Sequence, residues 1–131
     1  MAGALIDSDV LIDVLKGRQS AAAWIAEYSR DNLLITSSVN VFELARGWDS
    51  DRATEAGMAL LREFIILPLD TRAALEAAMI DTELQQRGTP LDAGDLLIAG
   101  MARANGLAII TRNVRHFGRI EGLEVVTPAV S

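Results

Sequence analysis

Residues 4–17 read Ala4-Leu5-Ile6-Asp7-Ser8-Asp9-Val10-Leu11-Ile12-Asp13-Val14-Leu15-Lys16-Gly17, and their hydrophobic period changes partway along. The first three residues form a continuous apolar run that ends at Asp7, as in a buried strand. The following apolar residues keep helical spacing, Asp7 or Ser8 can cap the helix, and Gly17 stops it. The stretch therefore predicts a buried strand that passes directly into an amphipathic helix.

The rest of the chain repeats this alternation of short apolar runs and helical patterns. Because apolar strands separated by helices are typical of a parallel sheet covered on both faces, we expect an α/β fold with four to five strands. We find no linker or internal repeat, so residues 1–131 are expected to form a single domain. The further strands are expected at 33–36, 65–69, 107–111 and 123–126, and the further helices at 20–28, 38–47, 51–64, 71–87 and 92–105. Pro68 places the 65–69 strand at an edge, or marks its end.

Polar residues follow the expected strands directly. In such sheets the ligand crevice lies beyond the carboxyl ends of the strands, so these residues are the ones to inspect. They are Asp7-Ser8-Asp9, Thr36-Ser37-Ser38, Asp70-Thr71 and Thr111-Arg112-Asn113.

Three acids stand out as candidates for a common site. Asp7 follows a strand, although it could simply cap the next helix. Glu43 lies in a mostly apolar helix, where a partly buried carboxylate needs a cation or a metal as partner. Asp95 abuts the apolar run 96–99 and is expected to face the crevice, whereas Asp92 is explained as an N-cap favoured by the helix dipole.

The densest cationic stretch follows the 107–111 strand and contains Arg112, Arg115, His116 and Arg119. Such a run is usually a solvated loop, and its functional interpretation is a rim that contacts phosphate beside an acidic centre. Asn113 in this stretch could turn the chain or orient a water.

The donor types favour a hard cation. The chain has no cysteine and one histidine, which excludes disulfides, thiolate catalysis and zinc or iron–sulfur sites held by cysteine. Oxygen ligands suit Mg²⁺ or Mn²⁺, and such a site suits phosphodiester hydrolysis because the metal lowers the pKa of water and neutralises phosphate.

Four segments, in this order and spacing, resemble PIN-domain ribonucleases, and most closely the VapC toxins of bacterial toxin–antitoxin pairs. They are Leu5-Ile6-Asp7-Ser8-Asp9-Val10-Leu11-Ile12, Val41-Phe42-Glu43-Leu44, Asp95-Leu96-Leu97-Ile98-Ala99 and Thr111-Arg112-Asn113-Val114-Arg115-His116-Phe117.

The resemblance implies a three-layer α/β/α fold and an endoribonuclease that depends on Mg²⁺ or Mn²⁺. Asp7, Glu43 and Asp95 fall on the three main acidic positions of the family, and Thr111 on its hydroxyl position near the metal. His116 stands where a fourth acid is common, so Asn113 or Asp92 would contribute to the metal site instead. The implied partners are a second copy of the chain and a VapB-type antitoxin, through which alone the pair would bind operator DNA.

Two alternatives remain open at this point. Asp7-Ser8-Asp9-Val10 and Leu34-Ile35-Thr36 also resemble motifs of haloacid-dehalogenase phosphatases, but that family needs a later lysine and Lys16 is the only one. The second alternative is a catalytically inactive PIN-like binding module, because His116 stands where the family commonly has a fourth acid.

Charge and hydropathy limit the partners and the location. Twelve Lys and Arg against 18 Asp and Glu give a net charge of −6, which argues against indiscriminate coating of nucleic acid. No apolar run approaches the roughly 18–20 residues that span a bilayer, and the N-terminus lacks the basic region of a secretory signal. We therefore expect a cytoplasmic protein with no membrane contact.

Overall fold

The computed structural model describes residues 3–128. Its centre is a five-stranded, all-parallel sheet in the order β3-β2-β1-β4-β5. The strands are β1 (Ala4–Ile6), β2 (Ile35–Ser37), β3 (Ile65–Leu67), β4 (Ala108–Ile110) and β5 (Val125–Val126). The expected α/β class and parallel sheet are confirmed, and β1, which carries Asp7 at its end, is the central strand.

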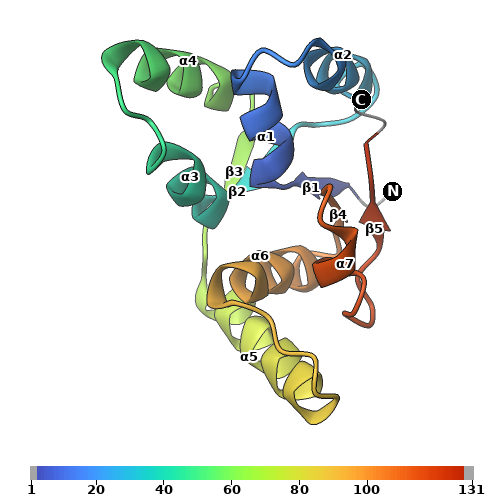
Figure 1. Cartoon of the computed structure of the whole chain (residues 1–131). Coiled ribbons are helices and arrows are strands. Elements are labelled where there is room, and N and C mark those ends of the chain that lie inside the picture. The colour runs from blue at the N-terminus through green and yellow to red at the C-terminus, as the bar shows by residue number, and fades with distance from the viewer. Residues whose placement is uncertain (1–2, 129–131) are drawn as a thin grey trace.

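Helices cover both faces of the sheet, which makes three layers (Figure 1). On one face lie α1 (Ser8–Leu15), α2 (Gln19–Tyr28), α3 (Ser38–Ala45) and α4 (Asp51–Leu61), and on the other α5 (Thr71–Gln86), α6 (Ala93–Ala104) and the short α7 (Val114–Phe117). No described helix is long and apolar enough to cross a membrane.

The alternation of side chains along β1 divides the apolar interior into two cores. Leu5 packs with α5, α6 and α7, whereas Ala4 and Ile6 pack with α1 to α4. Ile109 and Ile110 of β4 divide in the same way. Because successive strand residues point to opposite faces, a strand that is apolar throughout serves both cores at once.

The expected strand boundaries hold within two residues, and the larger differences are in helices. β2 starts at Ile35 rather than residue 33, because Leu33 is 68% exposed and stands outside the sheet. The helix expected to reach residue 64 ends at Leu61, and the 114–117 segment expected as a loop contains α7. β3 is an edge strand that ends at Leu67, as Pro68 predicts.

Candidate active site

Asp7 lies at the carboxyl edge of the sheet, directly after the central strand. Its side chain accepts from the backbone N–H of Ser8 at 2.8 Å and so caps α1. The residue is only 6% exposed, and it lines a hollow at this edge of the sheet. Capping and facing the hollow are therefore compatible roles for the same carboxylate.

Neighbouring donors hold both oxygens of Asp7. The Thr111 hydroxyl donates to Oδ2 at 2.7 Å, and the Asn40 side-chain amide donates to Oδ1 at 3.0 Å. Burial, and then the charge of Asp9, raise the pKa of Asp7 to about 7, against the opposing effect of its hydrogen bonds and with a smaller increase from Glu43. Because burial and nearby acids disfavour the ionised carboxylate of Asp7, a cation bound beside it would stabilise that form.

Ser8 connects Glu43 and Asp7, because it donates a hydrogen bond to each of their carboxylates. The Ser8 hydroxyl donates to Glu43 Oε1 at 2.8 Å and accepts from the Asn40 amide at 2.8 Å. On the other side of Glu43, a Cβ added at Gly94 would lie 2.9 Å from Oε2. The glycine in the first turn of α6 therefore gives the Glu43 carboxylate its space between α1 and α6.

Asn40 belongs to the site, and the sequence did not point to it. It is fully buried, and its Oδ1 accepts from the Ser37 hydroxyl at 2.6 Å while its amide donates to Asp7 and Ser8. The available signal was an amide in an otherwise apolar helix, three residues before Glu43. Because Asn is also common at helix starts, that signal alone did not separate it from a cap.

Asp95 lies in the first turn of α6 and lines the same hollow as Asp7. Its Oδ2 is 3.2 Å from Nδ1 of His116, and the Asn113 amide lies 2.8 Å from that same ring nitrogen. The three residues thus form one contact group, and it is α7, expected as a loop, that brings His116 back toward Asp95.

Asp9 belongs to the site as well, although the sequence analysis did not select it. Its Oδ2 accepts from the backbone N–H of Arg112 at 3.0 Å, and the Thr111 hydroxyl lies 3.3 Å away. Its Oδ1 is buried without a hydrogen-bond partner, and burial raises the pKa of the carboxyl. A buried, unpartnered carboxylate oxygen is costly unless a cation or donor satisfies it.

The two arginines of the expected phosphate rim differ in their surroundings. Arg112 forms an ion pair with Asp13, a buried acid of α1 that also pairs with Arg18 at 3.3 Å. Arg115 is exposed on α7. The Arg112 side chain is therefore positioned by α1, which the sequence analysis did not predict.

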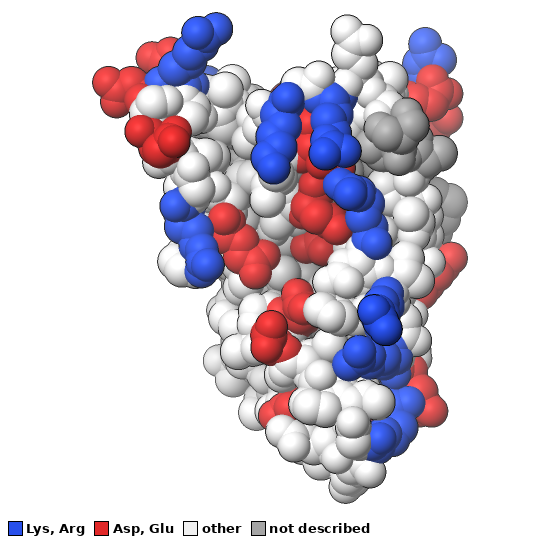
Figure 2. Space-filling model, in the orientation of Figure 1, with Lys and Arg blue, Asp and Glu red and all other residues white. Residues whose placement is uncertain are grey.

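Two adjoining hollows result from this arrangement. We call them the acidic hollow, about 320 Å³, and the apolar hollow, about 490 Å³. Asp7, Ser8, Asp9, Ile12, Glu43, Arg46, Asp95 and Asn113 line the acidic hollow. Ser38, Val39, Phe42, Glu43, Arg46, Leu69, Asp92, Gly94, Asp95 and Leu97 line the apolar hollow. Figure 2 shows acidic side chains across the middle of one face, with basic side chains on both sides.

The structure confirms only in part the prediction that Asp92 is the N-cap of α6. It is the N-cap residue of α6 by position, yet its side chain makes no cap hydrogen bond. It lines the apolar hollow and not the acidic one. Its contribution to a metal site stays a prediction.

The donor set of the acidic hollow fits a hard divalent cation. All its candidate ligands are oxygens, Asp7 is buried beside other acids, and Asp9 Oδ1 has no partner. Among residues 3–128, no three acidic or histidine side chains already form a cluster that could hold a metal. A cation would thus draw in Glu43 or Asp95, whose side chains are only partly buried.

Comparison with known proteins identifies the class. The PIN domain family matches residues 4–123, and the chain belongs to that family. It is 38% identical over 93 residues to the tRNA(fMet)-specific endonuclease VapC of Salmonella typhimurium, covering 68% of this chain and 70% of that one. It is 31% identical to the Shigella flexneri protein of the same name, covering 91% and 92%.

A solved structure gives the same result. The crystal structure of DNA-bound VapBC from Salmonella typhimurium matches with a TM-score of 0.81 and 28% identity, covering 97% of this chain and 98% of that one. Within the PIN family the chain is thus a VapC-type ribonuclease, the toxin component of a VapBC toxin–antitoxin system. This assignment excludes the phosphatase alternative.

Proposed function

We propose that the chain is an endoribonuclease that depends on Mg²⁺ or Mn²⁺ and hydrolyses RNA phosphodiester bonds at the acidic hollow. The observation that supports this most strongly is the buried Asp7 carboxylate, which shares that hollow with Glu43 and Asp95. These three acids would hold the ion, with Asn113 and Asp92 as further contributors. When bound, the ion neutralises charge on the phosphate and lowers the pKa of water.

The residues around the acids act by fixing them in place. Thr111 and Asn40 donate to the two oxygens of Asp7, and Ser8 donates to Glu43. These bonds leave the carboxylates with little freedom to turn away when RNA binds, and this preorganisation lowers the cost of reaching the reactive geometry.

Binding of the substrate would involve the cationic side of the acidic hollow. We propose that Arg112, Asn113 and Arg115 contact the RNA backbone. Thr111 at the end of β4 is fully buried and donates to Asp7, so it would act on the substrate only through that carboxylate. The Salmonella and Shigella relatives are named for cleavage of initiator tRNA. A structured RNA is accordingly the first substrate class to test.

The proposed partners follow the same relatives. Solved relatives include a VapBC pair bound to DNA and a toxin–antitoxin complex from Klebsiella pneumoniae. We propose that this chain forms a homodimer, binds a VapB-type antitoxin and reaches operator DNA only through it. Its action on RNA would take place in the cytoplasm.

The test is cleavage by purified protein with and without divalent metal. Asp7→Asn and Asp95→Asn should each lower cleavage of total RNA by at least about 100-fold, as expected for loss of groups that stabilise the transition state. Glu55→Gln, an exposed acid on α4, is the matched control and should cleave as the wild type does.

Circular dichroism should show that both site variants remain folded. Full activity in either folded variant, or cleavage that persists in EDTA, would overturn the proposal. A folded wild-type protein that cleaves no RNA under any metal condition would favour the inactive binding module.

A further inference from the structure

Phe42 is a large aromatic side chain left in solvent beside the acids. It is 62% exposed, while its helix α3 buries Asn40 and Leu44. It directly precedes Glu43, so its ring lines the apolar hollow while the neighbouring carboxylate lies between the two hollows. Packing within the chain therefore does not account for this ring.

Arg46 lies one helical turn after Phe42 and covers one face of its ring. The guanidinium carbon is 5.6 Å from the ring centroid, a cation–π arrangement. Arg46 also lines both hollows, so it stands where they meet. The planar guanidinium and the ring together present a flat, partly cationic surface.

The acidic and apolar hollows adjoin each other, and three residues line both: Glu43, Arg46 and Asp95. A nucleotide has the same division, with a charged phosphate on one side and a flat, largely apolar base on the other. If the scissile phosphate lies at the acids, the base next to it has the apolar hollow within reach. A volume of about 490 Å³ lies within the range of small-ligand pockets.

Asp92 adds a polar group to this apolar wall. Its carboxylate lines the hollow and makes no cap hydrogen bond to α6. Carboxylates accept hydrogen bonds from the amino groups of bases, as from N4 of cytosine. The hollow thus offers both a stacking surface and an acceptor, which suits a base better than an aliphatic side chain.

We propose that the apolar hollow is a nucleobase subsite, in which Phe42, backed by Arg46, stacks on the base adjacent to the scissile phosphate and Asp92 accepts from its edge. This inference rests on the proposed ribonuclease function and adds to it a residue that determines specificity. Stacking of a base on an aromatic side chain is worth about 1–3 kcal/mol, or roughly 5- to 150-fold in affinity.

The experiment uses a synthetic RNA that carries a mapped cleavage site, and two copies with an abasic ribose on either side of the cleaved bond. For the wild type, one abasic copy should be bound and cleaved at least about 5-fold less well than the intact RNA. Phe42→Leu should show this loss on intact RNA and no further loss on the abasic copy. Phe42→Tyr should restore the wild-type pattern.

Two further variants sharpen the test. Leu75→Ala, on α5 and also 62% exposed, is the matched control and should behave as the wild type. Asp92→Asn should change the ratio of cleavage rates between RNAs that differ only in the base at the subsite position. An equal fall in cleavage of all these RNAs would instead assign Asp92 to the metal site and overturn its role at the base.

Several results would overturn the subsite. One is equal binding and cleavage of intact RNA by Phe42→Leu and the wild type. Another is loss of antitoxin binding in Phe42→Leu with RNA handling unchanged, which would make the hollow a protein contact. If the wild type cleaves no RNA, the proposed function fails and the subsite that rests on it fails too, whereas equal cleavage of intact and abasic RNA by the wild type overturns the subsite alone.

Discussion

At the scale of single residues, the site depends on a side chain that carries no charge. Asn40 links Ser37, Asp7 and Ser8, and through Ser8 it also supports Glu43. It is fully buried, so each of its polar atoms depends on these partners for hydrogen bonding. The acids that the sequence shows plainly are thus held by an amide that it does not single out.

Replacing Asn40 with Ala should therefore cost both stability and activity. The change removes one of several hydrogen bonds from Asp7 and from Ser8 and leaves the buried Ser37 hydroxyl without its acceptor, which typically costs about 1–3 kcal/mol. Urea unfolding measures the loss, and RNA cleavage should fall with it. Asn32→Ala is the matched control, because Asn32 donates to a single carbonyl, that of Tyr28, from a partly buried position. Equal stability of the two variants would contradict the role given to Asn40.

At the scale of elements, α5 and α6 pack closely against each other. A Cβ added at Gly100 would lie 2.6 Å from the carbonyl oxygen of Ala73 and 2.7 Å from Cβ of Ala77. Only a glycine allows the two helices to approach so closely. This packing places the start of α6, and with it Asp95, against the rest of the site.

Two glycines of α6 should consequently respond differently to the same substitution. Gly100→Ala should destabilise the fold by about 1–3 kcal/mol, because backbone must move. Gly94→Ala meets only the flexible end of Glu43, so it should leave the melting temperature almost unchanged while lowering cleavage. Thermal unfolding and cleavage rates, measured on both, separate the two effects. A large stability loss in Gly94→Ala would be evidence against this account.

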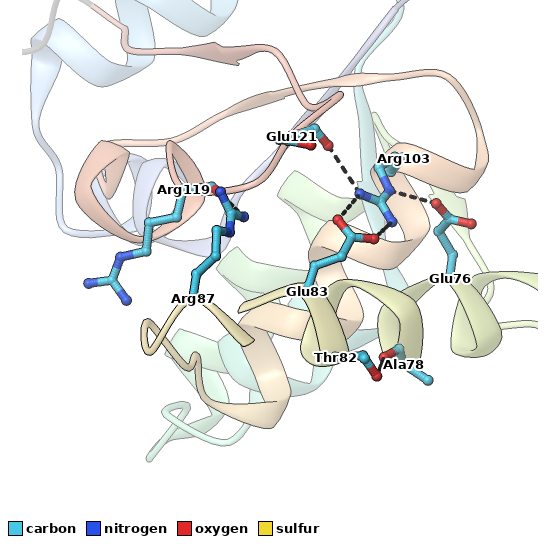
Figure 3. A network of polar contacts seen from close by, with 8 residues as sticks. All are labelled: Glu76, Ala78, Thr82, Glu83, Arg87, Arg103, Arg119 and Glu121. Carbon is cyan, nitrogen blue, oxygen red and sulfur yellow. Dashed lines mark hydrogen bonds and ion pairs between the residues drawn. The ribbon is translucent and has the colours of Figure 1, made fainter. Parts of the chain in front are cut away.

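Arg103 ties α6 to α5 and to the segment that leads to β5 (Figure 3). Its guanidinium contacts Glu76 and Glu83 of α5 and the carbonyl oxygen of Glu121. The hydrogen bond from Arg103 lowers the pKa of Glu83 below its ordinary value of 4.5. Near it, Arg87 donates to the carbonyl of Arg119, which joins the end of α5 to the turn after α7.

The ion pair between Glu83 and Arg103 should make a small, pH-dependent contribution to the free energy of unfolding. A carboxyl with a lowered pKa stabilises the fold above its unfolded pKa, and this term is lost as the pH falls through the folded pKa. Glu83→Gln should thus lower stability at pH 7 by less than about 1 kcal/mol, because the pair is partly exposed. Urea unfolding should show the difference between variant and wild type shrinking below about pH 4.5. A difference that grows with acidity would be inconsistent with it.

At the scale of the whole molecule, the net charge of −6 is distributed unevenly. Asp7, Asp9, Glu43 and Asp95 gather around one hollow, while basic side chains lie beside it (Figure 2). The repulsion among these acids opposes folding, and an added cation would relieve it. The proposed binding of a polyanion by a protein that is acidic overall would therefore depend on this local arrangement and on a bound cation.

Divalent metal should therefore stabilise the folded chain. Binding at ten times Kd contributes about 1.4 kcal/mol by mass action, which corresponds to a rise in Tm of roughly 3–6 °C. Thermal unfolding with Mg²⁺ or Mn²⁺, compared with NaCl at equal ionic strength, measures the shift. Asp95→Asn should reduce it and Glu55→Gln should not. No shift at a metal concentration that supports cleavage would contradict a formed site.

Local patterns in the sequence determine the fold class and the identity of the acids. Hydrophobic period and capping residues act over a few neighbours, so they predict the strand at Ala4–Ile6, the helix after it and the acid between them. The same locality explains why the limits of β2 were wrong, since exposure of Leu33 depends on the sheet around it. The candidate acids could be selected by their position alone, either after an expected strand or inside an expected apolar helix.

The tertiary structure alone decided which of these residues meet. The strand order makes β1 central, so Asp7 comes within hydrogen-bond distance of Asn40, 33 residues away, and of Thr111, 104 residues away. It also pairs Arg112 with Asp13 and leaves Phe42 at the edge of the acids. The physical reason is that burial and hydrogen bonding depend on contacts between distant segments. The hydrophobic period of a segment indicates only which of its own residues face the interior.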